Sequence, residues 1–447
     1  MSRVALIGEN SVEYVNALLD IWNNGDCAVL IDWRIPFQTA IKMMNEAKVH
    51  TCYIEKKLLD KMPVSLSESI TFIPFERKVM IADYLPESVY GKFKPNYSNN
   101  EAIVLYSSGT TGKSKGIILS HYAINTNADA IIDYMKPNST DHIYIAKTLS
   151  HSSTLTGELL VSLKTHTKLV IAPTIVPPRY MLSNICKFNV TIICLNPTLL
   201  SMLVNEVQRS KYDISSLKKI YVSGSILTDK IYEKAHVAFN NIAIYNVYGL
   251  SEAGPRVTAQ RDGCCLSNSV GTPIKDIQIV IVDECGIPVL KKKRGIIHVN
   301  TPSRFTTYVI GHEKQSLYKG WLNTGDIGYW DENNELHIIE RADDVIILDA
   351  HKLYPSEIEK KILESSYVSE CVVTKTKCKD EEFISCLYVG ENISESELRN
   401  MLQKSLPVYE IPRRFIRCES IPRTLNGKIS KEIVQIITEI HKDGVNI

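Results

Sequence analysis

Residues 102–116 read AIVLYSSGTTGKSKG, an apolar run that leads into a loop of hydroxyl-bearing residues, glycines and lysines. The apolar run predicts a strand, and the loop offers backbone N–H groups, hydroxyls and ammonium groups to phosphate oxygens. The phosphate loop of nucleoside triphosphatases has the pattern G-x-x-x-x-G-K-[ST], so Gly112-Lys113-Ser114 would need a glycine at position 107, where this chain has Ser107. The stretch therefore predicts a polyphosphate-binding loop of another kind. A flexible surface turn is the alternative interpretation, but it explains the glycines and not the many anion-binding groups.

The sequence around this loop alternates short apolar strands with amphipathic helices. Strands are predicted at 4–7 and 28–31, and the helix between them can be capped by Asn10 with Glu13 three residues on. The alternation continues with strands at 101–105, 143–146, 169–171, 191–194, 219–222 and 242–245, and with helices at 121–134, after Gly157, at 179–187, from Pro197 and from Thr228. This order predicts an α/β fold with large parallel or mixed sheets.

The pattern changes after Gly249. Residues 270–340 consist of short β segments separated by turn residues, and from about 344 an α+β unit follows. We therefore expect a large N-terminal domain at 1–340 with a β-rich subdomain at 270–340. A charged turn at 341–343 would be the hinge, and 344–447 would form a small, mobile C-terminal lid domain.

The composition narrows the class of protein. Of the 447 residues, 44% are hydrophobic and 23% charged, which is typical of a globular protein of two or three domains. The formal net charge of +1 gives no general electrostatic reason to expect nucleic acid or an acidic membrane as a partner. Eleven scattered cysteines without a C-x-x-C pair favour a reduced protein, so we expect a cytoplasmic location.

Four further motifs follow the loop in a recognisable order. They are YGLSE at 248–252, TGD at 324–326, RAD at 341–343 and PRTLNGK at 422–428. In this order and at these separations the chain resembles the adenylate-forming superfamily, which comprises acyl- and aryl-CoA synthetases, luciferases and the adenylation domains of peptide synthetases. The resemblance covers nearly the whole chain. It implies that a carboxylate attacks the α-phosphate of ATP to give an acyl-adenylate and pyrophosphate, with Mg²⁺ as cofactor.

The resemblance also implies a role for each motif in binding ATP. The loop residues expected to close over the β- and γ-phosphates are Ser107, Ser108, Thr110, Thr111, Lys113 and Lys115. Glu252 resembles the carboxylate that holds Mg²⁺. Ser251 would reach the α-phosphate, and Tyr248 and Gly249 would lie at the adenine, with Asn246 near its exocyclic amine.

By the same resemblance, Asp326 and Arg341 bind the ribose hydroxyls, and Asp343 is the hinge about which the C-terminal domain reorients. Taken alone, each would be read as a solvated charged residue. Lys428 resembles the lysine whose ammonium offsets the charge that develops between the attacking carboxylate and the α-phosphate. Lys428, Glu252 and His151 are thus the predicted catalytic residues.

The acid is expected to lie beside His151, which resembles the family's gate next to the acyl carboxylate. The other residues expected to line the acyl pocket are Ser223, Gly224, Ser225, Gly249, Ala253 and Gly254, of which the last three would leave room for a planar or bulky group. Amino-acid-activating relatives place an aspartate near 150–154, where this chain has none. We therefore expect an aromatic or medium-chain acid without an α-amino group.

Three departures from the family bear on the acceptor of the acyl group. Glu340 and Ala350 stand where the family has glycines, and the chain begins at what resembles the family's first well-packed strand and helix. A Cβ at Ala350 would narrow the approach of a pantetheine arm. CoA is the expected acceptor. A carrier protein is the alternative acceptor, and a nucleotide-binding module without catalysis is the alternative from a different class.

Overall fold

The computed structural model describes residues 1–62, 69–78, 82–107, 115–174, 176–262, 268–310, 317–318, 320–348, 351–378, 381–424 and 428–440. The chain forms two compact units. The first consists of 1–280, 298–324 and 334–336, and the second consists of 281–297, 325–333 and 337–447. The β-rich segment expected at 270–340 is thus divided between the two units, and the hinge at 341–343 stays a prediction.

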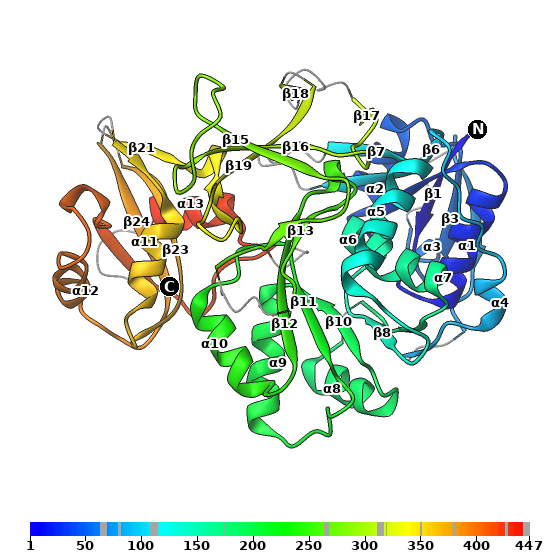
Figure 1. Ribbon diagram of the computed structural model, residues 1–447, viewed down its shortest axis with the longest axis horizontal. Helices are drawn as coiled ribbons and strands as arrows, with labels where there is room; N and C mark the ends of the chain where they lie inside the picture. Colours follow the sequence, from blue (N-terminus) through cyan, green and yellow to red (C-terminus); the bar gives the residue numbers. More distant parts are fainter. Residues whose placement is uncertain are drawn as a thin grey trace. The chain divides into compact units, whose positions relative to one another are not determined.

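The first unit contains a seven-stranded sheet, which includes the two strands on either side of the predicted phosphate loop (Figure 1). Its order is β17 (Thr307–Tyr308), β7 (Lys115–Ser120), β6 (Glu101–Ser107), β2 (Cys27–Ile31), β1 (Arg3–Ile7), β3 (Thr51–Glu55) and β4 (Thr71–Phe75). The pairs among β1 to β4 and the pair β2–β6 are parallel, whereas β7 is antiparallel to both β6 and β17. The sheet is therefore mixed, as the sequence predicts.

An eight-stranded sheet forms the second layer of the first unit. Its order is β14 (Thr272–Pro273), β13 (Arg256–Ala259), β12 (Ala243–Gly249), β11 (Lys219–Val222), β10 (Ile192–Leu195), β8 (His142–Ile145), β9 (Lys168–Ile171) and β5 (Asp83–Tyr84). Its central pairs, from β9 through β8, β10 and β11 to β12, are parallel. The carboxyl ends of these strands therefore lie at one edge, where the chain enters the loops at 146–151, 223–225 and 250.

Helices cover both sheets. They are α1 (Val12–Asn23), α2 (Phe37–Glu46), α3 (Lys56–Leu59), α4 (Glu87–Tyr90), α5 (His121–Met135), α6 (Ser152–Thr154), α7 (Val161–Thr165), α8 (Pro178–Lys187), α9 (Pro197–Arg209) and α10 (Asp229–Ala238). Two short helices, the π-helix η1 (Leu155–Leu160) and the 3₁₀-helix η2 (Ser251–Ala253), complete the unit. Buried apolar residues of α8, α9 and α10 form one core with β8 to β12, beside which these helices lie in Figure 1.

Two predictions about helix starts were wrong. Ser11, not Asn10, caps α1, because the Ser11 hydroxyl accepts a hydrogen bond from the backbone N–H of Tyr14. Asn10 instead holds a distant loop: its Nδ2 donates to the carbonyl of Lys147 at 2.7 Å, and its Oδ1 accepts from the N–H of Leu149 at 2.8 Å. The helix expected after Gly157 already begins at Ser152 and passes through the π-helix η1.

The β-rich segment forms a sheet with the order β15 (Gln278–Val282), β16 (Gly295–Asn300), β19 (Trp321–Trp330) and β18 (Leu317–Tyr318), and β20 (Leu336–Arg341) pairs with β19. The second unit continues through η4 (Ala342–Asp344) and the hairpin of β21 (Ile346–Leu348) and β22 (His351–Leu353). It ends in a three-stranded sheet of β23 (Val368–Cys378), β24 (Glu381–Gly390) and β25 (Arg414–Arg417).

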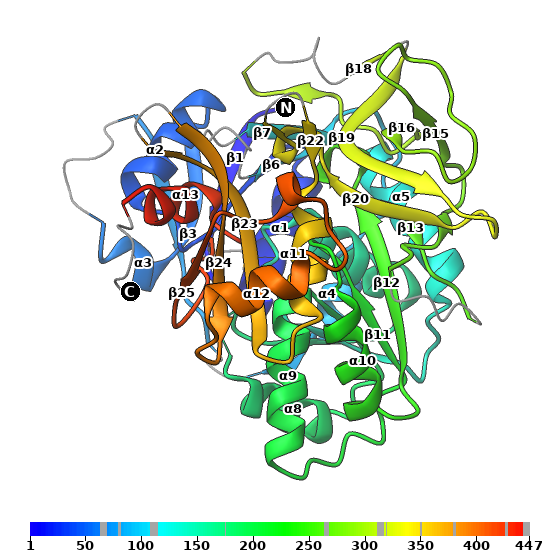
Figure 2. The same cartoon turned by 90° about the vertical axis from the view of Figure 1, so that its left-hand side faces the viewer.

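Three helices cover this last sheet, as expected for an α+β unit. Figure 2 shows α11 (Pro355–Leu363) and α12 (Glu395–Leu402) beside β23 and β24, with which they share a core. Val434 of α13 (Lys431–Ile440) packs with Val372 and Leu387 in a separate core. A capping box of Ser394 and Glu397 marks the start of α12.

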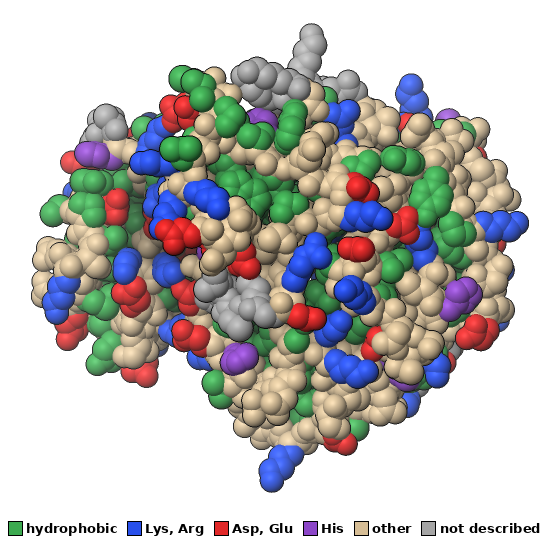
Figure 3. Space-filling view, viewed as in Figure 1, with side chains coloured by type: hydrophobic (Ala, Val, Ile, Leu, Met, Phe, Trp, Pro, Cys, Tyr) green, Lys and Arg blue, Asp and Glu red, His purple; other side chains and the backbone are tan. Residues whose placement is uncertain are grey.

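On the face shown in Figure 3, basic and acidic side chains are interspersed, as the net charge of +1 suggests. Within the described ranges, no helix combines the length and the apolar character that crossing a membrane requires.

Candidate active site

The predicted phosphate loop connects two antiparallel strands. Ser107 at the end of β6 pairs with Lys115 at the start of β7, so the two ends of the loop lie side by side. The predicted residues between them, namely Ser108, Thr110, Thr111 and Lys113, lie outside the described residues. The structure thus places the base of the loop at the end of the mixed sheet, and the roles of its residues stay predictions.

Tyr308 connects this loop to the predicted metal ligand. It lies on β17, opposite Ile117 of β7, and its hydroxyl donates to Glu252 Oε1 at 3.2 Å. The ammonium of Lys115 lies 6.0 Å from the centre of the Tyr308 ring. The backbone of Glu252 is held as well, because its carbonyl accepts from the N–H of Phe305 at 2.8 Å. Glu252 and Lys115 therefore contact the same aromatic side chain.

Tyr308 is a site residue that the sequence analysis missed. It belongs to none of the five motifs and lies in a two-residue strand, so no pattern in the sequence marks it. Only the pairing of β17 with β7 brings it to the loop.

The turn after β12 folds back closely on its own backbone. A Cβ on Gly249 would lie 1.9 Å from the carbonyl oxygen of Pro255, and one on Gly254 would lie 2.5 Å from the carbonyl oxygen of Ser303. Gly254 also has a φ of +94°, which favours glycine. At both positions the neighbouring backbone leaves no room for a side chain, so glycine is required. Ala253 is fully buried. This differs from the expectation that their small size leaves room for an acyl group.

Ser251 on η2 lies next to the segment that carries His151. The hydroxyl oxygens of Ser251 and Ser152 are 2.9 Å apart, and Ser152 directly follows His151 in the chain. The Nδ1 of His151 lies 2.9 Å from the hydroxyl oxygen of Ser153. The structure therefore brings Ser251, predicted to reach the α-phosphate, into contact with the residue that follows His151, which is predicted to border the acid.

The other predicted residues of the first unit lie on β12 or in the turn after β11. Asn246 on β12 is buried, and its Nδ2 donates to the carbonyl of Ser269 at 3.0 Å. A contact to the adenine amine would therefore have to use its Oδ1, which can accept. Tyr248, two residues on, is half-buried. Ser223, Gly224 and Ser225 form the turn after β11, in which Gly224 has a φ of +103°.

The predicted ribose ligands meet in the second unit. Arg341 Nη1 lies 3.0 Å from Asp326 Oδ1, and the side chain of Asp326 is mostly buried. Gly325 permits this pairing, because a Cβ there would lie 3.0 Å from Arg341 Nη2. A carboxylate and a guanidinium held together in this way can offer both acceptors and donors to vicinal hydroxyls.

The second unit also holds the predicted hinge and the predicted catalytic lysine. Asp343 lies in the one-turn helix η4. Lys428 is exposed and closes a turn, since its carbonyl accepts from the N–H of Thr424 at 2.7 Å and its neighbour Ile429 pairs with Arg423. The roles of Asp343 and Lys428 stay predictions.

The two glycine replacements have different outcomes. Glu340 is buried, and its carboxylate accepts from the N–H groups of Ser356 at 2.9 Å and Arg341 at 3.3 Å. Burial raises the pKa of the Glu340 carboxyl, and the nearby Lys431 lowers it. Glu340 thus connects β20 to α11. Ala350 lies outside the described residues.

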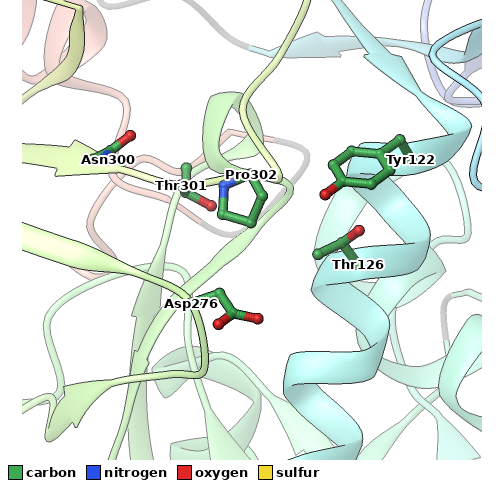
Figure 4. A pocket seen from close by; sticks show the side chains of 6 residues that line it. All are labelled: Tyr122, Thr126, Asp276, Asn300, Thr301 and Pro302. Carbon is green, nitrogen blue, oxygen red and sulfur yellow. The ribbon is translucent and has the colours of Figure 1, made fainter.

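A separate hollow of about 450 Å³ lies beside α5. Its lining residues are Tyr122, Thr126, Asp276, Asn300, Thr301 and Pro302. Figure 4 shows Tyr122 and Thr126 projecting from the helix toward Pro302. No residue predicted for ATP or acid binding lines it.

Across the described parts of the chain, no group of three or more His, Cys, Asp or Glu side chains could hold a metal. A single carboxylate such as Glu252 suits Mg²⁺ when phosphate oxygens and water complete its shell.

Comparisons with known proteins agree with this arrangement. The profile of the family described as "AMP-binding enzyme" matches residues 1–309, and that of the "AMP-binding enzyme C-terminal domain" matches residues 357–428. A fatty acid–[acyl-carrier-protein] ligase from Streptomyces coeruleorubidus is 26% identical over 96% of this chain and 85% of its own length. A 2-succinylbenzoate–CoA ligase from Enterococcus faecalis is 24% identical over 96% of this chain and 87% of its own length.

Solved structures show the same fold. ATP-bound MatB from Rhodopseudomonas palustris has a TM-score of 0.87 and is 21% identical, with 98% of this chain and 89% of that chain covered. MenE from Bacillus subtilis, an O-succinylbenzoate coenzyme A synthetase in complex with ATP and magnesium, has a TM-score of 0.81 at 21% identity, with 96% and 88% covered.

Proposed function

This chain belongs to the family of AMP-binding enzymes, and we propose that it activates a carboxylic acid as an acyl-adenylate and then transfers the acyl group to CoA. In the first step a carboxylate oxygen attacks the α-phosphorus of ATP, and the bond to the oxygen that bridges the β-phosphate breaks, so pyrophosphate leaves. In the second step the thiolate sulfur of CoA attacks the acyl carbon, and AMP leaves. Both steps depend mainly on positioning and on neutralising charge.

The proposal is carried by the way Glu252 and Ser251 connect two regions of the first unit. Through Tyr308, Glu252 adjoins Lys115 at the base of the phosphate loop. Through Ser152, Ser251 adjoins the segment of His151. The consecutive residues Ser251 and Glu252 thus connect the groups suited to bind a polyphosphate with the groups suited to bind an acid. A reaction between ATP and a carboxylate requires these two kinds of group to lie close together.

Each residue has a role in this scheme. Lys115 and the rest of the loop bind the β- and γ-phosphates, and Ser251 donates its hydroxyl hydrogen to the α-phosphate. Glu252, which Tyr308 orients, would hold Mg²⁺ together with phosphate oxygens, and the ion would neutralise charge on the departing pyrophosphate. His151 borders the acid carboxylate.

Residues of the second unit complete the proposal. The pair of Asp326 and Arg341 binds the ribose hydroxyls, and the ammonium of Lys428 offsets the charge that develops at the α-phosphate. Asp343 serves as the hinge between the half-reactions, since a polar residue in a one-turn helix can absorb a change in backbone dihedrals.

The acid is proposed to be aromatic or medium-chain. The segment at 150–154 offers no carboxylate to pair with an α-ammonium group. One relative named above is a ligase of acyl-carrier-protein and another is a ligase of CoA, so a carrier protein is the second candidate acceptor. Incubating the isolated acyl-adenylate and the enzyme with CoA, or with a phosphopantetheine-bearing carrier protein, separates the two acceptors.

The test of the first step is acid-dependent exchange of labelled pyrophosphate into ATP across a panel of carboxylic acids. We expect exchange with at least one acid and none when Mg²⁺ is chelated. If no acid stimulates the exchange although the protein still binds ATP, the chain is instead a nucleotide-binding module without catalysis.

A further inference from the structure

A group of buried charges lies beside the segment that carries His151. We call it the charged cluster; it consists of Lys147, Glu158 and Arg256. Glu158 is 0% and Arg256 2% exposed, and Lys147 Nζ lies 3.3 Å from Glu158 Oε1. The guanidinium of Arg256 reaches the π-helix η1, because a Cβ on Gly157 would lie 3.4 Å from Arg256 Nη2. None of the five motifs contains these three residues.

Each member of the charged cluster is held by its backbone. The N–H of Arg256 donates to Asn127 Oδ1 at 2.9 Å, and Asn127 Nδ2 donates to the carbonyl of Arg256 at 2.9 Å. Asn10 holds the carbonyl of Lys147, as described above. Glu158 lies on the π-helix, an irregular form of helix that is frequent at functional sites. The three charges are thus built into the fold rather than placed on mobile side chains at a surface.

The hydrogen bonding of the charged cluster is incomplete. Among the described residues, Arg256 Nε and both carboxylate oxygens of Glu158 have no hydrogen-bond partner, although Lys147 pairs electrostatically with Glu158. Burial raises the pKa of the nearby Tyr134 hydroxyl, and Arg256 lowers it. Buried polar groups of native proteins are nearly always paired, so the open Nε–H of Arg256 is a donor that an acceptor from a ligand or a water molecule would satisfy.

The charge of the cluster is also unbalanced. When all three side chains are ionised, two cations face one carboxylate. Burial raises the pKa of Glu158 to about 7, with Lys147 and Arg256 lowering it, so protonation of Glu158 would increase the imbalance. The other titratable groups close by do not correct it: burial raises the pKa of the Cys194 thiol to about 12, which keeps it neutral, and the exposed carboxylate of Asp262 adjoins the exposed, oppositely charged Arg261 in the chain. A buried excess of positive charge is costly unless an anion accompanies it.

Two connections join the charged cluster to the candidate active site. Lys147 Nζ lies 3.5 Å from the hydroxyl oxygen of Ser153, which in turn lies 2.9 Å from Nδ1 of His151. Arg256 is separated by only two residues in the chain from the end of η2, the short helix that begins at Ser251. The cluster therefore adjoins the residues that would border the acid.

We propose that the acid activated by this chain is a dicarboxylic acid, whose second carboxylate is bound by Arg256 and Lys147. This inference rests on the function proposed above and adds the class of substrate. A guanidinium presents a fork of donors that matches a carboxylate, and a second carboxylate brings the charge that balances the cluster. Arg256 and Lys147 are specificity-determining residues in this arrangement, since they bind the end of the acid that does not react.

The opposite charge on the substrate is disfavoured by the same geometry. An acid with a distal ammonium group would have Glu158 as its only anionic partner, and Lys147 and Arg256 already accompany that carboxylate. The repulsion by two buried cations would exceed the attraction of one carboxylate. A purely apolar acid would leave the excess charge without a counterion.

The experiment compares matched pairs of acids in the pyrophosphate-exchange assay. Hexanoate is paired with hexanedioate, and benzoate with its three dicarboxylate isomers. For the wild-type chain we expect kcat/KM to be at least about tenfold higher for one dicarboxylate than for its monocarboxylate partner, as one added charged hydrogen bond would give. Equal or better exchange with the monocarboxylates would overturn the inference and leave the proposed function standing, whereas no exchange with any acid would overturn both.

Two arginine variants localise the effect. Arg256→Gln is expected to lower kcat/KM for the dicarboxylate by roughly ten- to a hundredfold and to change the monocarboxylate value by less than about threefold. Arg261→Gln, at an exposed arginine five residues on, is the matched control and should change neither. Melting curves of both variants establish that they fold. A dicarboxylate preference that persists in folded Arg256→Gln would contradict the assignment, and Lys147→Met provides the same comparison if Arg256→Gln does not fold.

Discussion

The hydroxyl of Tyr308 donates a hydrogen bond to Oε1 of Glu252 at 3.2 Å, across 56 residues of sequence. The carboxylate proposed to hold Mg²⁺ is thereby kept in one orientation beside the strands that carry the phosphate loop. Hydrogen bonds to charged groups are stronger than those between neutral groups, so this one can orient the carboxylate before the metal arrives.

The first prediction concerns this bond. Tyr308→Phe removes the donor and keeps the ring, so we expect the Mg²⁺ concentration needed for half-maximal pyrophosphate exchange to rise by roughly tenfold, the equivalent of about 1.4 kcal/mol. Tyr180→Phe, at an exposed tyrosine of α8, is the control. An unchanged magnesium requirement in Tyr308→Phe would show that the bond does not serve the metal.

The second prediction concerns Lys428. Lys428→Ala is expected to lower the rate of adenylate formation by at least about a hundredfold while ATP binding stays nearly unchanged, because the ammonium acts on charge that develops only in the transition state. Single-turnover formation of the acyl-adenylate and equilibrium binding of ATP measure the two quantities. Lys404→Ala, at another exposed lysine of the second unit, is the control, and a normal adenylation rate in Lys428→Ala would contradict the role.

The third prediction concerns the ribose pair. If Asp326 accepts hydrogen bonds from the ribose hydroxyls, 2′-deoxy-ATP should bind the wild-type chain roughly tenfold more weakly than ATP. In Asp326→Asn the ratio of the two affinities should shrink toward one, because the 2′-hydroxyl of ATP no longer donates to a charged acceptor. The affinities of ATP and 2′-deoxy-ATP are measured for the wild-type chain and for Asp326→Asn. An equal ratio in the two proteins would exclude a contact between Asp326 and the 2′-hydroxyl.

The fourth prediction compares two glycines with positive φ. Gly254 has a φ of +94° and no room for a Cβ, whereas Gly25 has a φ of +78° with nothing within 4 Å of a Cβ. Gly25→Ala should cost only the backbone strain, about 1 kcal/mol, and Gly254→Ala should cost about 2 kcal/mol more because it also displaces Ser303. Urea unfolding of the two variants measures the difference, and equal costs would mean that the turn can shift freely.

The fifth prediction concerns pH. Burial raises the pKa of Glu158 to about 7 from its ordinary value of 4.5, so the folded chain binds this proton more tightly than the unfolded chain. The free energy of unfolding should therefore fall as the pH rises from about 4.5 to about 7, with this carboxyl contributing about 3 kcal/mol to the fall. Glu158→Gln cannot lose the proton and should show a flatter profile. Urea unfolding at pH 5 and pH 8 tests this, and an identical slope in the variant would contradict it.

Much of the fold follows from local patterns. Apolar runs such as 28–31 and 101–105 became β2 and β6, because a parallel strand buried on both faces must be apolar along its length. The start of α12 was predictable because Ser394 and Glu397 form a capping box within one turn. The start of α1 was not: Asn10 and Ser11 can both cap a helix, and the choice fell to Ser11 once Asn10 bound the loop at 147–149.

Some residues of the candidate site could likewise be predicted from the sequence, and others could not. Residues of the motifs, such as Ser251, Glu252, Asp326 and Arg341, could be singled out from the sequence because each belongs to a short, ordered pattern. Tyr308 could not, since it acts through the pairing of β17 with β7. Gly254 was singled out for a different reason from the one the structure gives, because the carbonyl that approaches it comes from Ser303, about fifty residues away.

The sequence by itself therefore determined the family, the alternation of strands and helices, and the polar residues that ATP chemistry needs, since periodicity and motifs are local properties of the chain. The tertiary structure decided which of these residues touch: Tyr308 with Glu252, Ser152 with Ser251, and Lys147 with Glu158. The physical reason is that strand register and the packing of helices on sheets set distances between residues that are far apart in the chain. Lys147, Glu158 and Arg256 form a cluster only because the tertiary structure sets those distances.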